Sequence, residues 1–293
     1  MSRVVVTGAS GFIGRHLCRA LAGEHTVHAL MRPKTSRAHG LGDVDLEVHE
    51  MGTDQSAADA LRRIEPEVVV HLATLFPNAA TVRDPVALVD ANVRFGAVLA
   101  AAAADIGSVF VTTSTSWQHY GGSDYSPVSL YAATKQAFND ILRYFGELEG
   151  LPVVDVCLYD TYGPDDDRMK LVSLLFEGAR NGRPIPMSDG YQLINLTHVS
   201  DVVAGIVSAM DAPPGSYVLR SRDSIRVRSV ADLARTVTGE PIPIQWGSFE
   251  SRPREMVTDW TFGTGLPGWQ PEIDLASGLR QLWLTEGDRD RHK

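Results

Sequence analysis

The fold of this chain is decided near its start by one glycine-rich stretch, Thr7-Gly8-Ala9-Ser10-Gly11-Phe12-Ile13-Gly14. An apolar run over residues 3–7 precedes it and a helical pattern over residues 12–22 follows it, so we expect a strand, a tight turn and a helix. Gly8 permits the turn, Gly11 lets a ligand approach the backbone, and Gly14 lets the helix pack closely against the strand. The arrangement predicts a dinucleotide-binding turn, with the pyrophosphate on the N-terminus of the helix. The predicted cofactor contacts are Gly8, Ser10, Gly11, Phe12, Ile13 and Gly14.

Strands and helices are expected to alternate through the first half of the chain. The predicted strands cover residues 3–7, 26–30, 46–50, 67–72, 108–113 and 153–159. The predicted helices cover residues 12–22, 57–64, 85–104 and 130–149. This alternation is typical of an α/β fold, a doubly wound parallel sheet of the Rossmann type with helices on both faces.

A smaller, interrupted C-terminal substrate lobe is expected after Gly163, where an acidic run at residues 165–167 is followed by closely spaced Gly and Pro. A helix over 197–210 and a strand over 216–219 would return to the sheet, and short helices over 230–238 and 273–284 would lie in the lobe. We therefore expect a dinucleotide-binding domain of residues 1–165 plus about 194–228. The substrate-binding lobe would comprise about 166–193 plus 229–287.

Composition excludes several classes of protein. The chain has 293 residues, 44% hydrophobic and 22% charged, which is typical of a globular protein. A formal charge of -9 argues against a nucleic-acid binder. Cys18 and Cys157 cannot form a disulfide framework and fit a reducing compartment. No secretory signal is recognisable and no apolar run reaches membrane-spanning length, residues 98–104 being the nearest. We expect a cytoplasmic protein with no nucleic-acid, membrane or metal partner.

The end of the second predicted strand indicates which dinucleotide binds. An acidic residue there would bind the adenosine ribose, but residues 29–34 read Ala-Leu-Met-Arg-Pro-Lys. Arg32 is the candidate for binding a 2′-phosphate, with Lys34, Arg37 and Arg15 as helpers, because a guanidinium can form two parallel hydrogen bonds to phosphate. The pattern favours NADP over NAD, the alternative being a solvated basic loop.

Tyr131 and Lys135 form a candidate catalytic pair. They stand four residues apart in a predicted helix and therefore share one face. A nearby ammonium lowers the pKa of a phenol and makes it a usable proton donor or acceptor. A run of hydroxyl residues at 112–116 ends the preceding strand, where one hydroxyl could bind the reacting oxygen. The alternative is that this run is only a polar strand end.

With these motifs the chain resembles the extended short-chain dehydrogenase/reductase family, which includes nucleotide-sugar epimerases, dehydratases and reductases. The resemblance covers nearly the whole length. The further matching pieces are Val70-His71-Leu72-Ala73, Asn92-Val93, Tyr162-Gly163-Pro164 and His198-Val199-Ser200-Asp201.

The resemblance implies roles for individual residues. Leu72, Ala73 and Asn92 would line the cofactor groove, Tyr131 would handle the proton, and Lys135 would also contact the nicotinamide ribose. The family's catalytic Ser or Thr usually lies four residues before an aromatic residue. Trp117 takes the aromatic position here, which points to Thr113, with Ser114 as the alternative.

Positions at which the chain departs from the family pattern argue against particular reactions that family members catalyse. The Asp-Glu pair of sugar dehydratases is replaced by Ser114-Thr115. The Cys and His of epimerase-reductases are replaced by Thr115 and the acidic run at 165–167. The acidic residue of 4-epimerases that recycle NAD is missing at the second strand. A one-way ketone reduction by NADPH remains.

The predicted substrate contacts are Thr115, Asp160 and Arg252. Arg252-Pro253-Arg254-Glu255 resembles the segment whose arginine binds the diphosphate of a nucleotide sugar, although Arg252 and Arg254 could also be plain surface charges. The family's Arg-Asp before the His-Val motif is Ile194-Asn195 here, and its Asn before Tyr-Gly-Pro is Asp160.

We therefore expect an NADPH-dependent reductase of a nucleotide-linked 4-keto-deoxysugar. The alternatives are a nucleotide-sugar epimerase with internal hydride return and a non-catalytic dinucleotide-binding regulatory protein. The resemblance also implies a homodimer paired through the helices predicted over 85–104 and 130–149.

Overall fold

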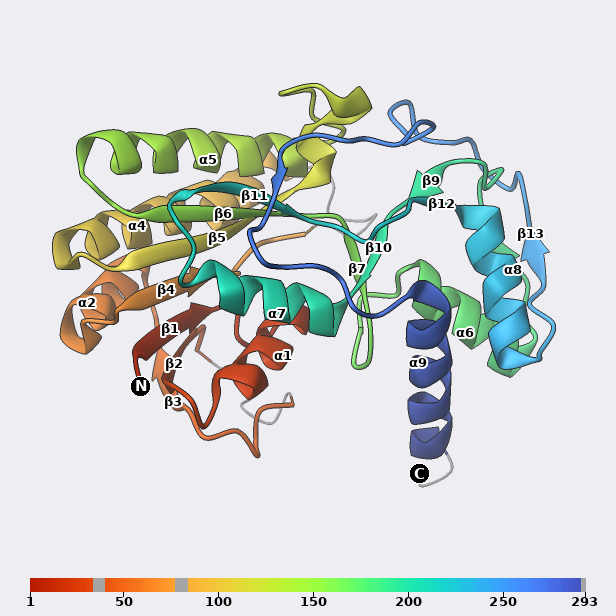
Figure 1. Ribbon diagram of the computed structural model, residues 1–293, viewed down its shortest axis with the longest axis horizontal. Coiled ribbons are helices and arrows are strands. Elements are labelled where there is room, and N and C mark those ends of the chain that lie inside the picture. Colours follow the sequence, from red (N-terminus) through yellow and green to blue (C-terminus); the bar gives the residue numbers. More distant parts are fainter. Residues whose placement is uncertain (34–39, 77–83, 291–293) are drawn as a thin grey trace.

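The centre of the molecule is an eight-stranded parallel sheet (Figure 1). The computed structural model describes residues 1–33, 40–76 and 84–290, with side chains up to Thr285. The strands, in sheet order, are β14 (Thr264–Gly265), β11 (Gly215–Leu219), β6 (Val153–Leu158), β5 (Val109–Thr115), β4 (Val68–His71), β1 (Arg3–Thr7), β2 (Thr26–Met31) and β3 (Glu47–Glu50). Every neighbouring pair is parallel. The order reverses direction between β1 and β4, and ligands of such sheets bind in the crevice at this point. The predicted doubly wound sheet is confirmed, and the predicted strand boundaries agree within two residues.

Helices cover both faces of the sheet because successive strand residues point to opposite sides. Val4 and Val6 pack against α1 (Phe12–Leu21) and α7 (Val199–Ala209) on one face. Val5 packs on the other face, which α2 (Asp54–Ile64), α4 (Phe95–Ile106) and α5 (Leu130–Leu148) cover (Figure 1). The uninterrupted valine runs of the central strands reflect burial on both faces.

The single helix predicted over residues 85–104 consists of three parts. They are α3 (Pro85–Val89), a π-helical turn (Asp90–Arg94) and α4. The expectation that no apolar stretch reaches membrane-spanning length is wrong, because the 22-residue helical stretch Pro85–Ile106 contains an 18-residue window with a mean hydropathy of 1.6. Its Leu99 and Ala100 are fully buried against the sheet layer. The stretch is apolar because it supplies core side chains to this layer.

A second hydrophobic cluster lies beside the sheet (Figure 1). It is formed by α6 (Leu171–Asn181), α8 (Val227–Thr238), α9 (Leu275–Asp290) and short strand pairs. The pairs are β7 (Asp160–Tyr162) with β10 (Leu196–His198), β8 (Ile185–Pro186) with β13 (Ile244–Gln245), and β9 (Leu193–Ile194) with β12 (Ile225–Arg226).

Helix α6 is not among the helices predicted from the sequence, which near this point shows closely spaced Gly and Pro residues. Its buried residues Val172, Leu175, Phe176 and Ala179 nevertheless follow helical spacing. The helix ends at Gly182, whose φ of 63° lies in the left-handed region. The glycine therefore terminates a helix here and does not prevent one.

Candidate active site

The glycine turn between β1 and α1 is shaped by close backbone contacts. Gly8 has a φ of +71°, and a Cβ there would lie 2.7 Å from both the Leu72 carbonyl carbon and the Ala73 nitrogen. A Cβ at Gly14 would lie 2.1 Å from the Gly8 carbonyl oxygen. Gly11 occupies the N-cap position of α1, where it brings no side chain. The first backbone N–H groups of α1 can therefore be approached by an anion, and the turn fits a dinucleotide pyrophosphate.

The end of β4, which lies beside this turn, is held in place by a chain of hydrogen bonds that links β4 to β1. The Ala73 N–H donates to Thr7 Oγ1 at 3.2 Å, and Thr7 Oγ1 lies 2.8 Å from Nδ1 of the buried His71. Burial, with a smaller effect of the Lys135 charge, lowers the pKa of His71 to about 3. The imidazole is therefore neutral, and its Nδ1 shares a hydrogen bond with the Thr7 hydroxyl. Leu72 and Ala73, both predicted to line the cofactor groove, lie against the Gly8 turn.

Asn92 fastens the segment that follows β4. Its Oδ1 accepts from the Leu75 N–H at 2.7 Å and from the Thr74 hydroxyl at 2.9 Å. Its Nδ2 donates to the Leu75 carbonyl and to Thr134 Oγ1, both at 3.1 Å. The side chain is 2% exposed. In this structure Asn92 therefore positions the groove wall.

Of the basic residues predicted to bind a 2′-phosphate, the structure describes Arg32 and Arg15. Arg32 is exposed just after β2, at the carboxyl edge of the sheet. Arg15 is a different case, because its guanidinium donates to the carbonyls of Ser10 at 2.8 Å and Asp165 at 2.7 Å. Arg15 is 5% exposed and ties α1 to the loop after β7, so it does not assist Arg32 here. Lys34 and Arg37 lie outside the described residues.

Tyr131 lies in the first turn of α5, whose N-cap residue Ser129 accepts from the Ala132 N–H. Burial raises the pKa of Tyr131 to about 12, against the opposing effects of a Thr74 hydrogen bond and the Arg168 charge. The expected lowering of this pKa by Lys135 is not observed, since burial dominates and Arg168 is the cation that acts on the phenol. Tyr131 therefore holds its proton at neutral pH, as a proton donor requires.

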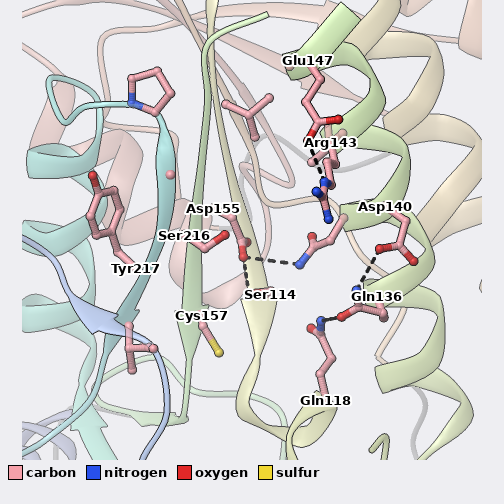
Figure 2. Close-up of a pocket in the computed structure, with 18 of the residues that line it drawn as sticks. Ser114, Gln118, Gln136, Asp140, Arg143, Glu147, Asp155, Cys157, Ser216 and Tyr217 are labelled. Atoms are coloured by element: carbon pink, nitrogen blue, oxygen red, sulfur yellow. Dashed lines mark hydrogen bonds and ion pairs between the residues drawn. The ribbon is translucent and has the colours of Figure 1, made fainter. Parts of the chain in front are cut away.

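Lys135 belongs to a buried polar group with Ser114, Asn139 and Asp155. Figure 2 shows Ser114 and Asp155 joined on adjacent strands, where Ser114 Oγ donates to Asp155 Oδ2 at 2.8 Å. Asn139 Nδ2 donates to the same oxygen at 3.3 Å. Burial raises the pKa of Asp155 to about 6 and lowers that of Lys135 to about 8, and the opposite charges of the two residues oppose both shifts. The Asp155 carboxylate and the Lys135 ammonium thus each favour the charged form of the other beneath α5.

The structure separates the two hydroxyl candidates on β5. Phe110 packs against the α4 and α5 side and Val111 against the other side. Since strand residues alternate, Ser114 shares the face of Phe110 and of α5, and Thr113 shares the face of Val111. The hydroxyl on the face of Tyr131 and Lys135 is that of Ser114, which was the alternative choice. Thr115 caps the 3-10 helix Ser116–Gln118 by accepting from the Trp117 N–H.

Aromatic rings lead from Tyr131 to the predicted substrate residue Arg252. Phe76 lies edge-on to Tyr131, with ring centroids 5.0 Å apart, and its centroid is 5.7 Å from that of Trp117. The Arg252 guanidinium lies 5.4 Å from the Trp117 ring centroid and is largely exposed. The ammonium of Lys170 lies 5.1 Å from the Phe76 centroid. Two cations therefore border the aromatic surface next to Tyr131.

Asp160 pairs with one of these cations. Lys170 Nζ lies 3.5 Å from Asp160 Oδ1, and burial lowers the pKa of Lys170. Arg168 is held by Asp166 and lies 4.3 Å above the Phe12 ring, next to the glycine turn. Both cations are therefore paired with carboxylates in this structure.

Sequence reasoning missed Thr74, Phe76 and Asp155. The one available signal was Asp155, an acidic residue inside a run that otherwise predicts a fully buried strand. Thr74 and Phe76 follow β4 in a segment without a recognisable motif, and only the fold brings them to Tyr131.

Comparison with known proteins shows the family of the chain. A sequence profile described as the NAD dependent epimerase/dehydratase family matches residues 4–219. The chain belongs to this family. Its members handle NAD(P) and nucleotide sugars, so the chain is an oxidoreductase-type enzyme of the short-chain dehydrogenase/reductase class.

Three similar proteins illustrate the activities named for relatives of this chain. A UDP-glucose 4-epimerase of Mycolicibacterium smegmatis is 29% identical, over 94% of this chain and 96% of that protein. A CDP-abequose synthase of Salmonella typhimurium is 23% identical, over 95% and 96%. The solved Thermus thermophilus UDP-glucose 4-epimerase in complex with NAD has a TM-score of 0.83 at 24% identity, over 96% and 97% of the two chains. This last similarity concerns the fold.

Proposed function

We propose that the protein is an NADPH-dependent reductase of the keto group of a nucleotide-linked 4-keto-deoxysugar. The observation that carries the proposal is the basic end of β2, where Arg32 is exposed and residues 29–33 contain no acid. A cation there binds a 2′-phosphate, and an acid would bind the free ribose hydroxyl. NADPH is the form from which cells draw hydride for reduction, so the charge at this position supports a one-way reaction.

The residues of α5 and β5 supply the acid chemistry. When bound, the nicotinamide supplies a hydride. Tyr131 keeps its proton at neutral pH and is suited to donate it to the carbonyl oxygen. Arg168, the cation that acts on the phenol in this structure, would stabilise the phenolate left behind, and the charged form of Lys135 would add to this effect in the cofactor-bound enzyme. The Ser114 hydroxyl, on the same face, would donate to the reacting oxygen after exchanging its present contact with Asp155 for one to the substrate. Thr113, which the sequence favours, is the other candidate hydroxyl.

The second hydrophobic cluster supports the proposed division into domains. It draws residues from 162–196, 225–246 and 275–283, and residues 199–219 belong to the core on the α1 side of the sheet. The sugar nucleotide would lie between the sheet and this lobe. Arg252 and Lys170 would bind the diphosphate, and Asp160 and Thr115 would lie near the sugar.

Epimerisation with internal hydride return is the second candidate. Two observations favour it: several of the matched relatives are named as epimerases, and one similar structure was solved with NAD. A further relative is named CDP-abequose synthase, a name that describes the synthesis of a nucleotide-linked sugar and not an epimerisation. It therefore supports the first candidate, the reductase.

One assay separates the candidates. Purified protein is mixed with NADPH and a panel of nucleotide-linked 4-keto-6-deoxysugars while the reduced-nicotinamide absorbance is followed. A reductase consumes NADPH in step with product, whereas an epimerase releases bound NAD on denaturation and consumes no cofactor. Tyr131→Phe should lower turnover by about 10²–10⁴-fold and keep NADPH binding. Full activity of that variant contradicts the assignment of Tyr131 as the proton donor. Absence of both NADPH consumption and epimerisation in the wild type contradicts the proposal and favours a regulatory role.

The expected homodimer is part of the proposal. The exposed apolar side chains Val86 and Val89 on α3, and Tyr144 and Leu148 on α5, support a helical interface. Ala100, which was expected to contribute to that surface, is buried within its own chain. Light scattering of the purified protein measures the mass, and a monomer at micromolar concentration contradicts the dimer.

The cytoplasmic location expected from the sequence stays a prediction.

A further inference from the structure

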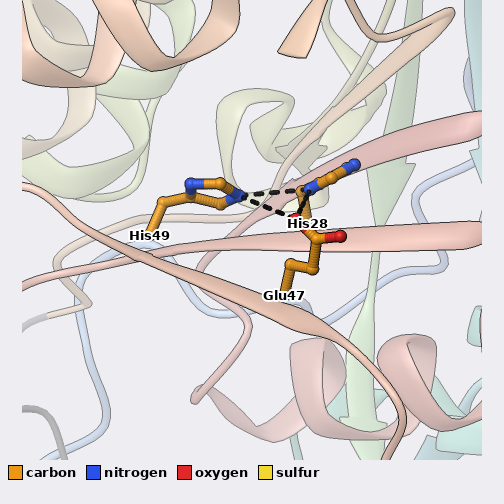
Figure 3. A group of neighbouring side chains, drawn as sticks. All are labelled: His28, Glu47 and His49. Carbon is orange, nitrogen blue, oxygen red and sulfur yellow. Dashed lines mark hydrogen bonds and ion pairs between the residues drawn. The ribbon is translucent and has the colours of Figure 1, made fainter. Parts of the chain in front are cut away.

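His28, Glu47 and His49 gather at the edge of the sheet, away from the proposed active site (Figure 3). His28 lies on β2, and the other two lie on the edge strand β3. The parallel register pairs His28 with Glu47 and Leu30 with His49. Because Glu47 and His49 are two residues apart on one strand, all three side chains lie on the same face of the sheet.

The three donor atoms have the spacing of a metal coordination shell. His28 Nδ1 lies 3.1 Å from His49 Nε2 and 3.3 Å from Glu47 Oε2. The distance from His49 Nε2 to Glu47 Oε2 is 4.0 Å. Ligands of tetrahedral zinc at bond lengths of about 2.0–2.2 Å lie about 3.3 Å apart, so one ion could contact all three with small side-chain movements.

The local charges suit a cation with nitrogen ligands. The His49 side chain is 27% exposed, and its Nε2 faces both the His28 Nδ1 and a carboxylate oxygen of Glu47. The His28 side chain is 8% exposed, and its Nε2 has no hydrogen-bond partner among the described residues. Glu47 supplies one negative charge, while Arg63 on α2 is the nearby positive charge that acts against a cation.

We propose that His28, Glu47 and His49 form a binding site for a divalent metal ion of the zinc type, with water as the fourth ligand. Two imidazoles and one carboxylate are a ligand set that zinc takes in proteins. The ion would join the edge strand β3 to β2. Sequence reasoning expected no metal, because the ligands come from two strands and form no short motif.

Zinc binding is measured on untagged protein that has been treated with a chelator. Isothermal titration should show one site per chain, and zinc should raise the melting temperature. Cobalt(II) at the same site should give the intense visible absorption of a tetrahedral complex, a signature that other histidines bound singly would not produce.

Substitutions of the proposed ligands test whether the ion binds at this site. His49→Ala and Glu47→Gln change side chains that are partly or largely exposed, and each should weaken zinc binding by about tenfold or more and abolish the cobalt spectrum. His119→Ala is the matched control, since it removes a histidine elsewhere and should bind zinc as the wild type does. The proposal is overturned if the wild type binds no zinc at micromolar concentration. It is equally overturned if His49→Ala, with wild-type circular dichroism, keeps the affinity and the cobalt spectrum.

Discussion

Ser114 Oγ donates a hydrogen bond to Asp155 Oδ2 at 2.8 Å, and this contact joins β5 to β6 directly beneath the helix that carries Tyr131 and Lys135. A carboxyl group inside a buried strand is costly unless its charge is supported. Here Ser114, Asn139 and the nearby Lys135 provide that support. The hydroxyl that we assign to the reacting oxygen is thus engaged with Asp155 here, and it would have to exchange this contact for one to the substrate.

The Asp155 carboxylate should set the alkaline limit of activity. Burial lowers the pKa of Lys135 to about 8, and the negative charge of Asp155 opposes this shift. In Asp155→Asn that support is lost, so the pKa of Lys135 falls further and the ammonium loses its proton at lower pH. The alkaline limb of the pH profile of kcat/KM should move to lower pH. Asp140→Asn, which changes an exposed carboxylate on the same helix, is the control and should keep the wild-type profile.

The same variant should alter stability in a defined pH range. Because the folded pKa of Asp155 is raised from 3.8 to about 6, the stability that its neutral form contributes is present below pH 4 and is lost as the pH rises to 6. Asp155→Asn should therefore gain stability relative to the wild type above pH 6, by up to about 3 kcal/mol, and no such gain should appear at pH 4. Urea unfolding at the two pH values measures this, and an equal difference at both contradicts the assigned pKa.

Substituting Ser114 and Thr113 one at a time identifies which of these two hydroxyls acts in catalysis. Ser114→Ala should lower kcat by about 10²–10³-fold, because it removes the donor on the face of α5. Thr113→Val removes the hydroxyl on the opposite face and should leave kcat within a few-fold of the wild type. Steady-state kinetics with saturating cofactor decides the matter, and the reverse ranking would restore Thr113 as the catalytic hydroxyl.

Arg32 should determine cofactor preference. Arg32→Ala removes a charge-assisted contact to the 2′-phosphate and should weaken NADPH binding by about 10- to 100-fold. NADH lacks that phosphate and its binding should change little. Fluorescence titration with both dinucleotides measures the effect, and an equal loss for both would refute the assignment.

Arg252 should act on substrate affinity. Among the described residues its guanidinium contacts the Trp117 ring and lies 4.0 Å from a carboxylate oxygen of Glu255, and the side chain is largely exposed, so we expect it to be able to bind a diphosphate. Arg252→Ala should raise KM by about tenfold and change kcat little. Arg254, which donates to Ser126 and Pro127, offers the matched control Arg254→Ala. Equal effects of the two substitutions would indicate a structural role.

The sequence was informative wherever the backbone itself requires a residue type. Gly8 and Gly14 were readable because no side chain fits at either position, and the strands were readable from their valine runs. The Tyr131 and Lys135 pair follows from helical spacing alone.

Other features depend on contacts between distant segments. The face that each β5 hydroxyl occupies depends on the strand register, and counting back from Trp117 selected Thr113. Arg15 looked like a phosphate ligand until the fold brought the Asp165 carbonyl to it. Asp155 gained its importance from Ser114 on the neighbouring strand.

The central claim is that hydride passes in one direction, from NADPH to a ketone. The direct measurement uses NADPH carrying deuterium at the transferred position of C4, with a nucleotide-linked 4-keto-6-deoxysugar, and mass spectrometry of the product. The account predicts one deuterium per product molecule, at the former carbonyl carbon, with one NADP⁺ formed for each. A product without deuterium, formed while NADPH is unchanged, would contradict the account and establish internal hydride return.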